Sequence, residues 1–126
     1  TDNINNLNQS FNVSFADDSQ TESFSGTSIF DSRLVLNEGT SSGTADTVSF
    51  VADTDIPRFE LRVAGQDLEV SQFFVSLDNG ASYTPAARNT VLTPSTTGKS
   101  IKVRVSLQDD SANPNPTVSS LAVLYD

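Results

Sequence analysis

Carboxylates are the side chains in this sequence with the most chemical potential, and they come in close groups. The groups are Asp17–Asp18, Asp53 with Asp55, and Asp109–Asp110. Carboxylate and backbone carbonyl oxygens are the ligands that Ca²⁺ prefers in proteins. The four residues of the last two groups are therefore weak candidate calcium ligands, although the EF-hand spacing is missing. The alternative is that all three groups are solvated acidic loops.

Other kinds of chemistry are excluded by composition. The 126 residues include no His, Cys, Met or Trp. Without His there is no Ser-His-Asp triad and no His general base, and without His or Cys a zinc or copper site is not expected. Two carboxylates could serve a glycosidase as acid and base, but no spacing selects such a pair. We expect a non-enzymatic protein with no cofactor, calcium being the one candidate ion.

The charge of the chain restricts its partners. Its net charge is −9, with seven Lys and Arg, and such a surface repels nucleic-acid phosphates. No stretch is long and apolar enough to cross a bilayer. We therefore expect neither nucleic-acid binding nor a membrane-embedded role.

Four of the basic residues fall on outward positions of two predicted strands. They are Arg58 and Arg62 in one strand and Lys102 and Arg104 in the other. If the two strands are neighbours, the four form a basic patch that could dock an acidic partner or another copy of the chain. The two strands can instead lie on opposite sheets. The alternative to a patch is that each basic side chain pairs with a local Glu or Asp and contributes little.

The stretch SLDNGASY, which begins at Ser76, has the chemistry of a turn. Asn79 and Gly80 can both take positive φ, as a type I′ hairpin turn requires. The carboxylate of Asp78 can accept backbone N–H bonds, and Tyr83 can pack back over the strand. The spacing resembles the Asp-box, a hairpin that is generally structural in sialidases and other secreted β-proteins. Since the motif is not repeated along the chain, we predict a structural hairpin and not a piece of a sialidase.

Strands must position these residues, because the apolar pattern has period two. Phe59, Leu61 and Val63 alternate with charged residues in 58–64, and the same alternation runs through 99–108. Further strands are predicted at 11–15, 29–37, 47–52, 68–77 and 117–126, with shorter ones near Phe24 and within 88–98. The Gly/Ser/Thr stretch 38–46 is predicted to be a flexible loop.

This pattern predicts an all-β fold, an antiparallel β-sandwich of jelly-roll type with about eight to nine strands. Residues 1–10 are predicted to be a polar N-terminal arm and 11–126 a single domain. The residues expected to point into the core are Phe59, Leu61, Val63, Phe73, Val75, Leu77, Ile101, Val103, Val105, Leu121 and Val123.

The second half of the chain, about 72–126, resembles a known kind of module. Its segments QFFVSLDNGASYTPA and IKVRVSLQDDSANPNPTVSSLAVLYD are similar to the second half of a jelly-roll module of tailed-bacteriophage virion and tail proteins. The resemblance implies a structural protein of a virus particle, either a capsid decoration protein or a tail-associated module. Such a protein would sit at the virion surface or outside the cell, as a homo-oligomer in contact with other virion proteins or with copies of itself.

The same architecture is similar to that of galactose-binding-like carbohydrate modules. That likeness implies the alternative function, a carbohydrate-binding module for a cell-surface or extracellular polysaccharide. The chain departs from those modules in having no Trp and only two Tyr, which are the usual platforms for a sugar ring.

Overall fold

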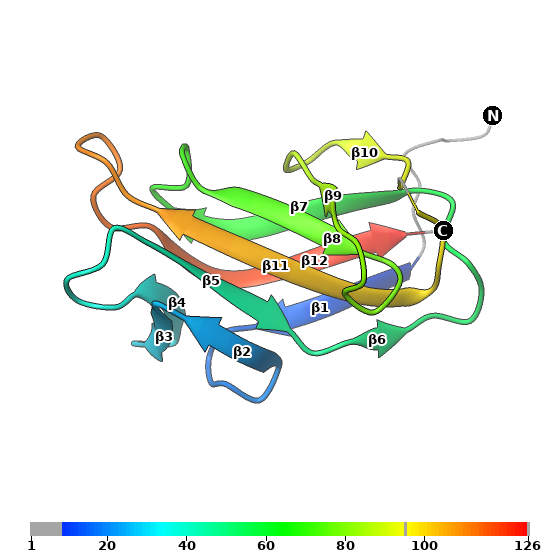
Figure 1. Ribbon diagram of the computed structural model, residues 1–126, viewed down its shortest axis with the longest axis horizontal. Coiled ribbons are helices and arrows are strands. Elements are labelled where there is room, and N and C mark those ends of the chain that lie inside the picture. The colour runs from blue at the N-terminus through cyan, green and yellow to red at the C-terminus, as the bar shows by residue number, and fades with distance from the viewer. Residues whose placement is uncertain (1–8, 95, 126) are drawn as a thin grey trace.

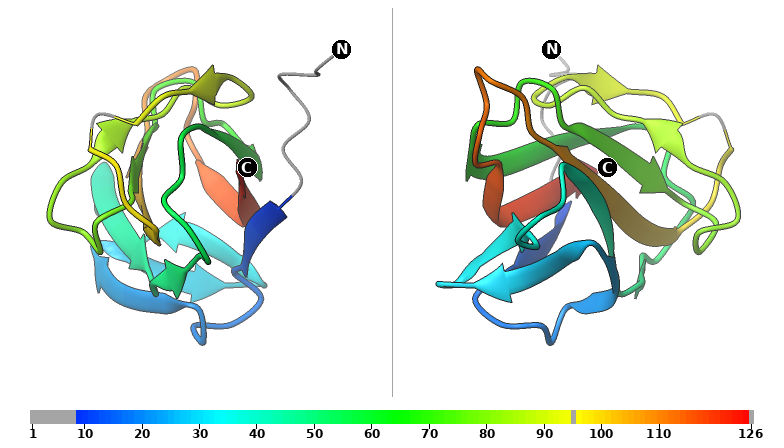
Figure 2. Two further views of the ribbon diagram at one scale, coloured as in Figure 1. Left: turned by 90° about the vertical axis from the view of Figure 1, so that its right-hand side faces the viewer. Right: turned by 60° about the vertical axis from the view of Figure 1, so that its left-hand side comes forward.

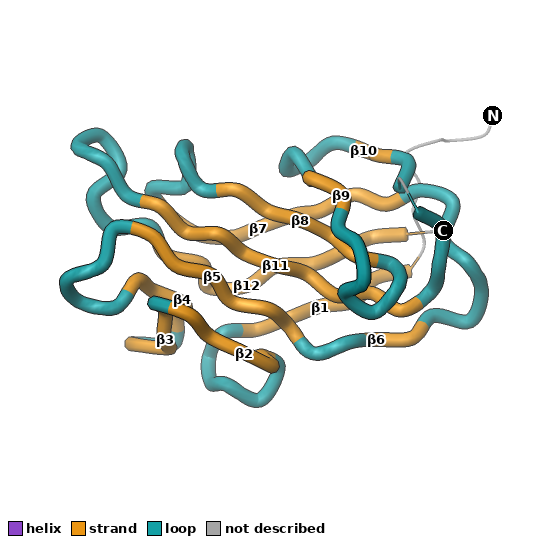
Figure 3. The backbone as a smooth tube through the Cα atoms, in the orientation of Figure 1, coloured by secondary structure: helices purple, strands orange, loops and turns teal. Residues whose placement is uncertain are grey.

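The computed structural model describes residues 9–94 and 96–125, which form strands and no helix (Figures 1 and 3). The strands are β1 (Gln9–Ser14), β2 (Thr21–Ser25), β3 (Thr27–Phe30), β4 (Arg33–Leu36), β5 (Ser42–Thr47), β6 (Phe50–Val51), β7 (Phe59–Gln66), β8 (Gln72–Ser76), β9 (Thr84–Pro85), β10 (Val91–Leu92), β11 (Ser100–Gln108) and β12 (Thr117–Tyr125). The described residues contain no helix long and apolar enough to span a membrane.

These strands form two antiparallel sheets that pack face to face (Figure 1). The first sheet has the order β10-β7-β12-β4-β3, and β1 also pairs with β12. The second has the order β2-β5-β11-β8-β9, and β6 also pairs with β11. The predicted all-β antiparallel sandwich is therefore confirmed.

The number of strands is twelve in the described residues, more than the eight to nine predicted. Eight of them follow the jelly-roll order, β1-β12-β7-β10 in one sheet and β5-β11-β8-β9 in the other. The additional strands β2, β3, β4 and β6 are short. The segment 29–37 was expected to be one strand, but it contains a hairpin turn at Asp31-Ser32, where no Gly or Pro announces a turn.

The stretch 38–46, predicted to be a loop, contributes most of β5. Its small and polar residues have little strand propensity of their own. β5 is nevertheless held on both sides, by β2 and by β11, so pairing with distant strands outweighs local propensity.

The core lies between the sheets and is built by alternation. In β11 the residues Ile101, Val103, Val105 and Leu107 are buried while those between them are partly exposed. All the residues predicted to face inward are buried except Val63, which is partly buried and packs against the core. The predicted register of the central strands is therefore right.

Two predictions about individual segments need correction. The alternation in 58–64 predicts that Glu60 lies on an outward face open to solvent or to an interface, yet Glu60 is only 7% exposed. Its neighbours across the sheet, Leu124 and Val91, lie on the same face and cover it. In addition, β1 already begins at Gln9, inside the segment predicted as an arm, and the rest of that segment, 1–8, lies outside the described residues.

Candidate functional site

The loop between β8 and β9 contains the predicted turn at Asn79-Gly80. Both residues have positive φ, 62° and 89°. The turn is closed by the Ala81 N–H, which donates a hydrogen bond to the Asp78 carbonyl oxygen at 3.3 Å. The turn does not directly join two strands as a two-residue hairpin would, since β8 ends at Ser76 and β9 begins only at Thr84. The tight turn is confirmed, but it lies within a longer loop.

The carboxylate of Asp78 holds this loop together. It accepts hydrogen bonds from the Ser82 N–H at 2.9 Å, from the Ser82 hydroxyl at 2.6 Å and from the Ser76 hydroxyl at 2.7 Å. The Ser76 oxygen in turn accepts the Gly80 N–H at 2.8 Å. The Ser82 hydroxyl first, and then that of Ser76, lower the pKa of Asp78 from 3.8 to about 2. The ionised carboxylate of Asp78 thus stabilises the turn through these hydrogen bonds.

The same loop is attached to the second sheet. The Asn79 N–H donates to the Ser100 carbonyl oxygen at 3.1 Å, and the Ser100 N–H donates to that of Leu77 at 3.0 Å. The Arg104 guanidinium lies over the Tyr83 ring, 4.5 Å from its centroid. Burial raises the pKa of the Tyr83 hydroxyl. Each residue of the predicted hairpin therefore has a structural contact.

The four basic residues predicted as interface candidates are not brought together. Arg62 lies in β7, which Arg58 directly precedes, and β7 belongs to the first sheet; Lys102 and Arg104 lie in β11 of the second. Since outward faces of opposite sheets point away from each other, no single basic patch forms.

Local carboxylates pair with three of these cations instead. Lys102 Nζ lies 2.7 Å from Glu22, Arg104 Nε lies 2.7 Å from Asp46, and Arg62 Nε lies 3.0 Å from Glu60. The hydrogen bond that Lys102 donates to Glu22 raises the pKa of Lys102. The alternative expectation, in which each basic side chain pairs with a nearby carboxylate, holds for these three.

The candidate calcium ligands lie at opposite ends of the sandwich. Asp53 and Asp55 follow β6, which pairs with the start of β11, whereas Asp109 and Asp110 follow the end of β11 (Figure 1). Asp110 accepts bonds from Asn113, which lower the pKa of its carboxyl group. Within the described residues no three acidic side chains gather as a metal-binding group, so the two pairs cannot serve one ion.

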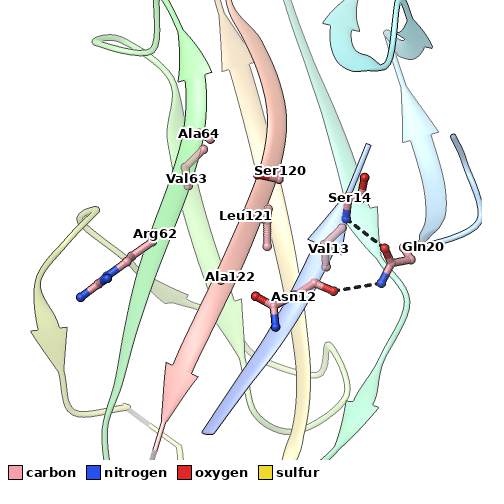
Figure 4. Close-up of a pocket in the computed structure, with 10 residues that line it drawn as sticks. All are labelled: Asn12, Val13, Ser14, Gln20, Arg62, Val63, Ala64, Ser120, Leu121 and Ala122. Carbon is pink, nitrogen blue, oxygen red and sulfur yellow. Dashed lines mark hydrogen bonds between the residues drawn. The ribbon is translucent and has the colours of Figure 1, made fainter. Parts of the chain in front are cut away.

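A shallow groove of about 410 Å³ runs over the outer face of the first sheet, across β1, β12 and β7 (Figure 4). The described residues that line it are mostly small or polar, and Arg62 is the only ionisable one among them. Arg62 is already bound to Glu60.

At one wall of this groove, Gln20 covers the free edge of β1. Its amide nitrogen donates to the Asn12 carbonyl oxygen at 2.9 Å, and its amide oxygen accepts the Ser14 N–H at 2.9 Å (Figure 4). The side chain thereby replaces a neighbouring strand over one backbone pair, which blunts this edge against pairing with another chain.

β2 and β6 lie along the same side of the sandwich (Figures 1 and 2), and both carry exposed apolar side chains. Phe24 of β2 is paired with the buried Ala45, and Phe50 of β6 with the buried Ile101, so both rings lie on the inner side of their strands. Each is nevertheless 38% exposed, and Val51, which follows Phe50 and points to the opposite face of β6, is 60% exposed.

Across the gap between the sheets, Phe50 stacks on Phe11 of β1, with ring centroids 5.3 Å apart. Phe24 borders a hollow of about 450 Å³ that is also lined by Asp17 and Asp18. Sequence reasoning missed this surface. The available signal was the consecutive pair Phe50-Val51, because a strand with two adjacent apolar residues must turn one of them outward.

Comparison with protein-family models and with curated proteins gives no match for this sequence.

Proposed function

We propose that the chain is a non-enzymatic structural module of a virus particle, a capsid decoration or tail-associated protein that acts through protein–protein contacts. The resemblance of 72–126 to phage virion modules suggests this class. One structural observation supports it: of the four large apolar side chains that are most exposed among the described residues, Phe24, Phe50 and Val51 all belong to β2 and β6. Apolar side chains exposed along one side of a domain are candidates for an interaction site.

The chemistry of this side indicates what its partner offers. Val51, which points outward from β6 and is 60% exposed, suits an apolar projection of the partner. Asp17 and Asp18 are exposed near Phe24, so basic residues at the partner's rim would be attracted. The acidic body of the chain would then contact a more basic surface of the particle at the virion exterior.

The proposal is tested by asking whether the chain occupies virus particles. We expect antibodies against the chain to label gradient-purified particles at regular positions in electron micrographs. Particles stripped of the chain should rebind recombinant wild type in co-sedimentation. Val51→Glu should reduce that binding by about tenfold or more, since it places a charge at the most exposed apolar side chain of β2 and β6. Phe30→Ala is the matched control, because Phe30 is also an exposed apolar residue but lies in β3, outside β2 and β6. This variant should bind particles as the wild type does. Absence of the chain from particles would overturn the proposal.

A further inference from the structure

The fourth exposed apolar side chain, Phe30, stands at the lip of a separate groove. The groove has a volume of about 510 Å³ and lies between the β3–β4 hairpin and the loop that joins β11 to β12. That volume is in the range of small-ligand sites, about 300–1,000 Å³. None of its lining residues belongs to β2 or β6, so the groove is distinct from the surface proposed to contact other proteins.

Phe30 is 71% exposed and is presented by a short turn. It pairs across the hairpin with Arg33 and lies on the outer face of the first sheet, because its neighbour Ile29 pairs with the buried Leu34. Asp31 binds Arg33 at 2.9 Å. The Phe30 ring is therefore an exposed aromatic face beside Arg33, whose charge is already paired with that of Asp31.

The floor of the groove carries an unused hydroxyl. Val35 of β4 and Thr117 of β12 are paired there, on the face opposite the buried Leu34 and Val118. The Thr117 Oγ1 atom is buried and has no hydrogen-bond partner among the described residues. Buried hydroxyls are normally satisfied, so a ligand that draws this side chain toward the groove would supply the partner that the Thr117 hydroxyl lacks.

The far wall is polar and is held in place by its own hydrogen bonds. It carries the carboxylates of Glu38 and Asp109 and the amide of Asn115. The Asn115 N–H donates to Asp67 at 3.2 Å, and the Thr40 hydroxyl donates to the Asn37 carbonyl oxygen at 2.7 Å. Walls that are ordered before binding lower the entropic cost of taking a ligand.

From this lining we infer that the groove binds a neutral saccharide ring. Carboxylate and amide oxygens offer acceptors for hydroxyl donors, Asn115 offers a donor, and the exposed Phe30 ring offers a face for C–H groups. An anionic ligand would be repelled by Glu38 and Asp109, and a purely apolar ligand would leave them unpaired. The inference does not depend on the proposed virion role.

Saturation-transfer NMR on the whole chain provides the test. The probes are the methyl glycosides of glucose, galactose, mannose and N-acetylglucosamine, and we expect at least one to bind with a Kd of about 1 mM. A basic Lys/Arg tripeptide is included because the two carboxylates could instead attract a cation. Binding of the tripeptide in place of every sugar would overturn the ligand class.

Two variants locate the site. Phe30→Ala should weaken saccharide binding about tenfold, and Thr117→Val should weaken it without lowering the thermal unfolding midpoint, because the lost hydroxyl has no partner in the free protein. Val51→Glu should bind saccharide as the wild type does, even though it is expected to lose particle binding, so failure of one proposal is distinguishable from failure of the other. No transfer from any sugar, or transfer that survives Phe30→Ala, would overturn the inference.

Discussion

Two turns of this protein place consecutive residues at positive φ, and they serve different ends. At Asn79-Gly80 the turn is folded against the second sheet and braced by the Asp78 carboxylate. At Asp31-Ser32, where φ is 56° and 60°, the turn directly joins β3 to β4 and presents the exposed Phe30. The strong sequence signal for a two-residue hairpin thus belongs to the longer loop, and the weak signal to the actual two-residue hairpin.

The difference shows where local chemistry is decisive. In the braced loop, Ser76, Asp78 and Ser82 supply side-chain bonds, so its conformation follows from residues close in sequence. In the β3–β4 hairpin, pairing of Thr27 with Leu36 and of Ile29 with Leu34 sets the register. The strands then impose positive φ on Asp31 and Ser32, which lack the conformational freedom of glycine. Three changes test this contrast.

The largest effect is expected in the braced turn. Gly80 has a φ of 89°, which a β-branched residue hardly adopts, so Gly80→Val should lower the free energy of unfolding by about 1–3 kcal/mol. Chemical denaturation measures it. Ala81→Val, one residue away and exposed, is the control and should change little. Equal losses at both positions would mean that backbone strain is not the cause.

A smaller, pH-dependent effect is expected from Asp78→Asn. The folded-state pKa of Asp78, about 2, lies below the ordinary value of 3.8, so its carboxylate stabilises the fold above about pH 4 and that contribution is lost as the pH falls through about 2. The variant should therefore lose less stability than the wild type over this range, as followed by thermal melts. Ser82→Ala removes a donor and should flatten the profile in part. Parallel profiles for wild type and Asp78→Asn would contradict this account.

The smallest effect is expected in the hairpin. Replacing Asp31-Ser32 by Asn-Gly, which a type I′ turn favours, should raise the free energy of unfolding by about 0.5–1 kcal/mol. The result is read from the same denaturation experiment. A loss of stability would show that Asp31 contributes more through its ion pair with Arg33 than positive φ costs.

Much of the fold can be predicted from the sequence pattern, whereas the positions that are exposed at the surface can be predicted only poorly. Alternation in 99–108 correctly places Ile101, Val103 and Val105 in the core. The alternation in 58–64 places Glu60 on an outward face open to solvent or to an interface, because it cannot show that neighbouring strands cover that face. Phe24 and Phe30 give no sign in the sequence that they are exposed, since apolar residues in strands are usually buried.

By itself the sequence determined that the chain is all-β, which residues of its long strands face inward, and that Asn79-Gly80 turns. These features depend on period-two alternation and on bonds between residues a few positions apart. Only the tertiary structure decided which sheet each strand joins. That choice separates Arg62 from Arg104, buries Glu60 and leaves Phe30 and Val51 in solvent. The physical reason is that β-pairing joins segments far apart in the chain, as Thr117 joins Val35, so no local pattern contains it.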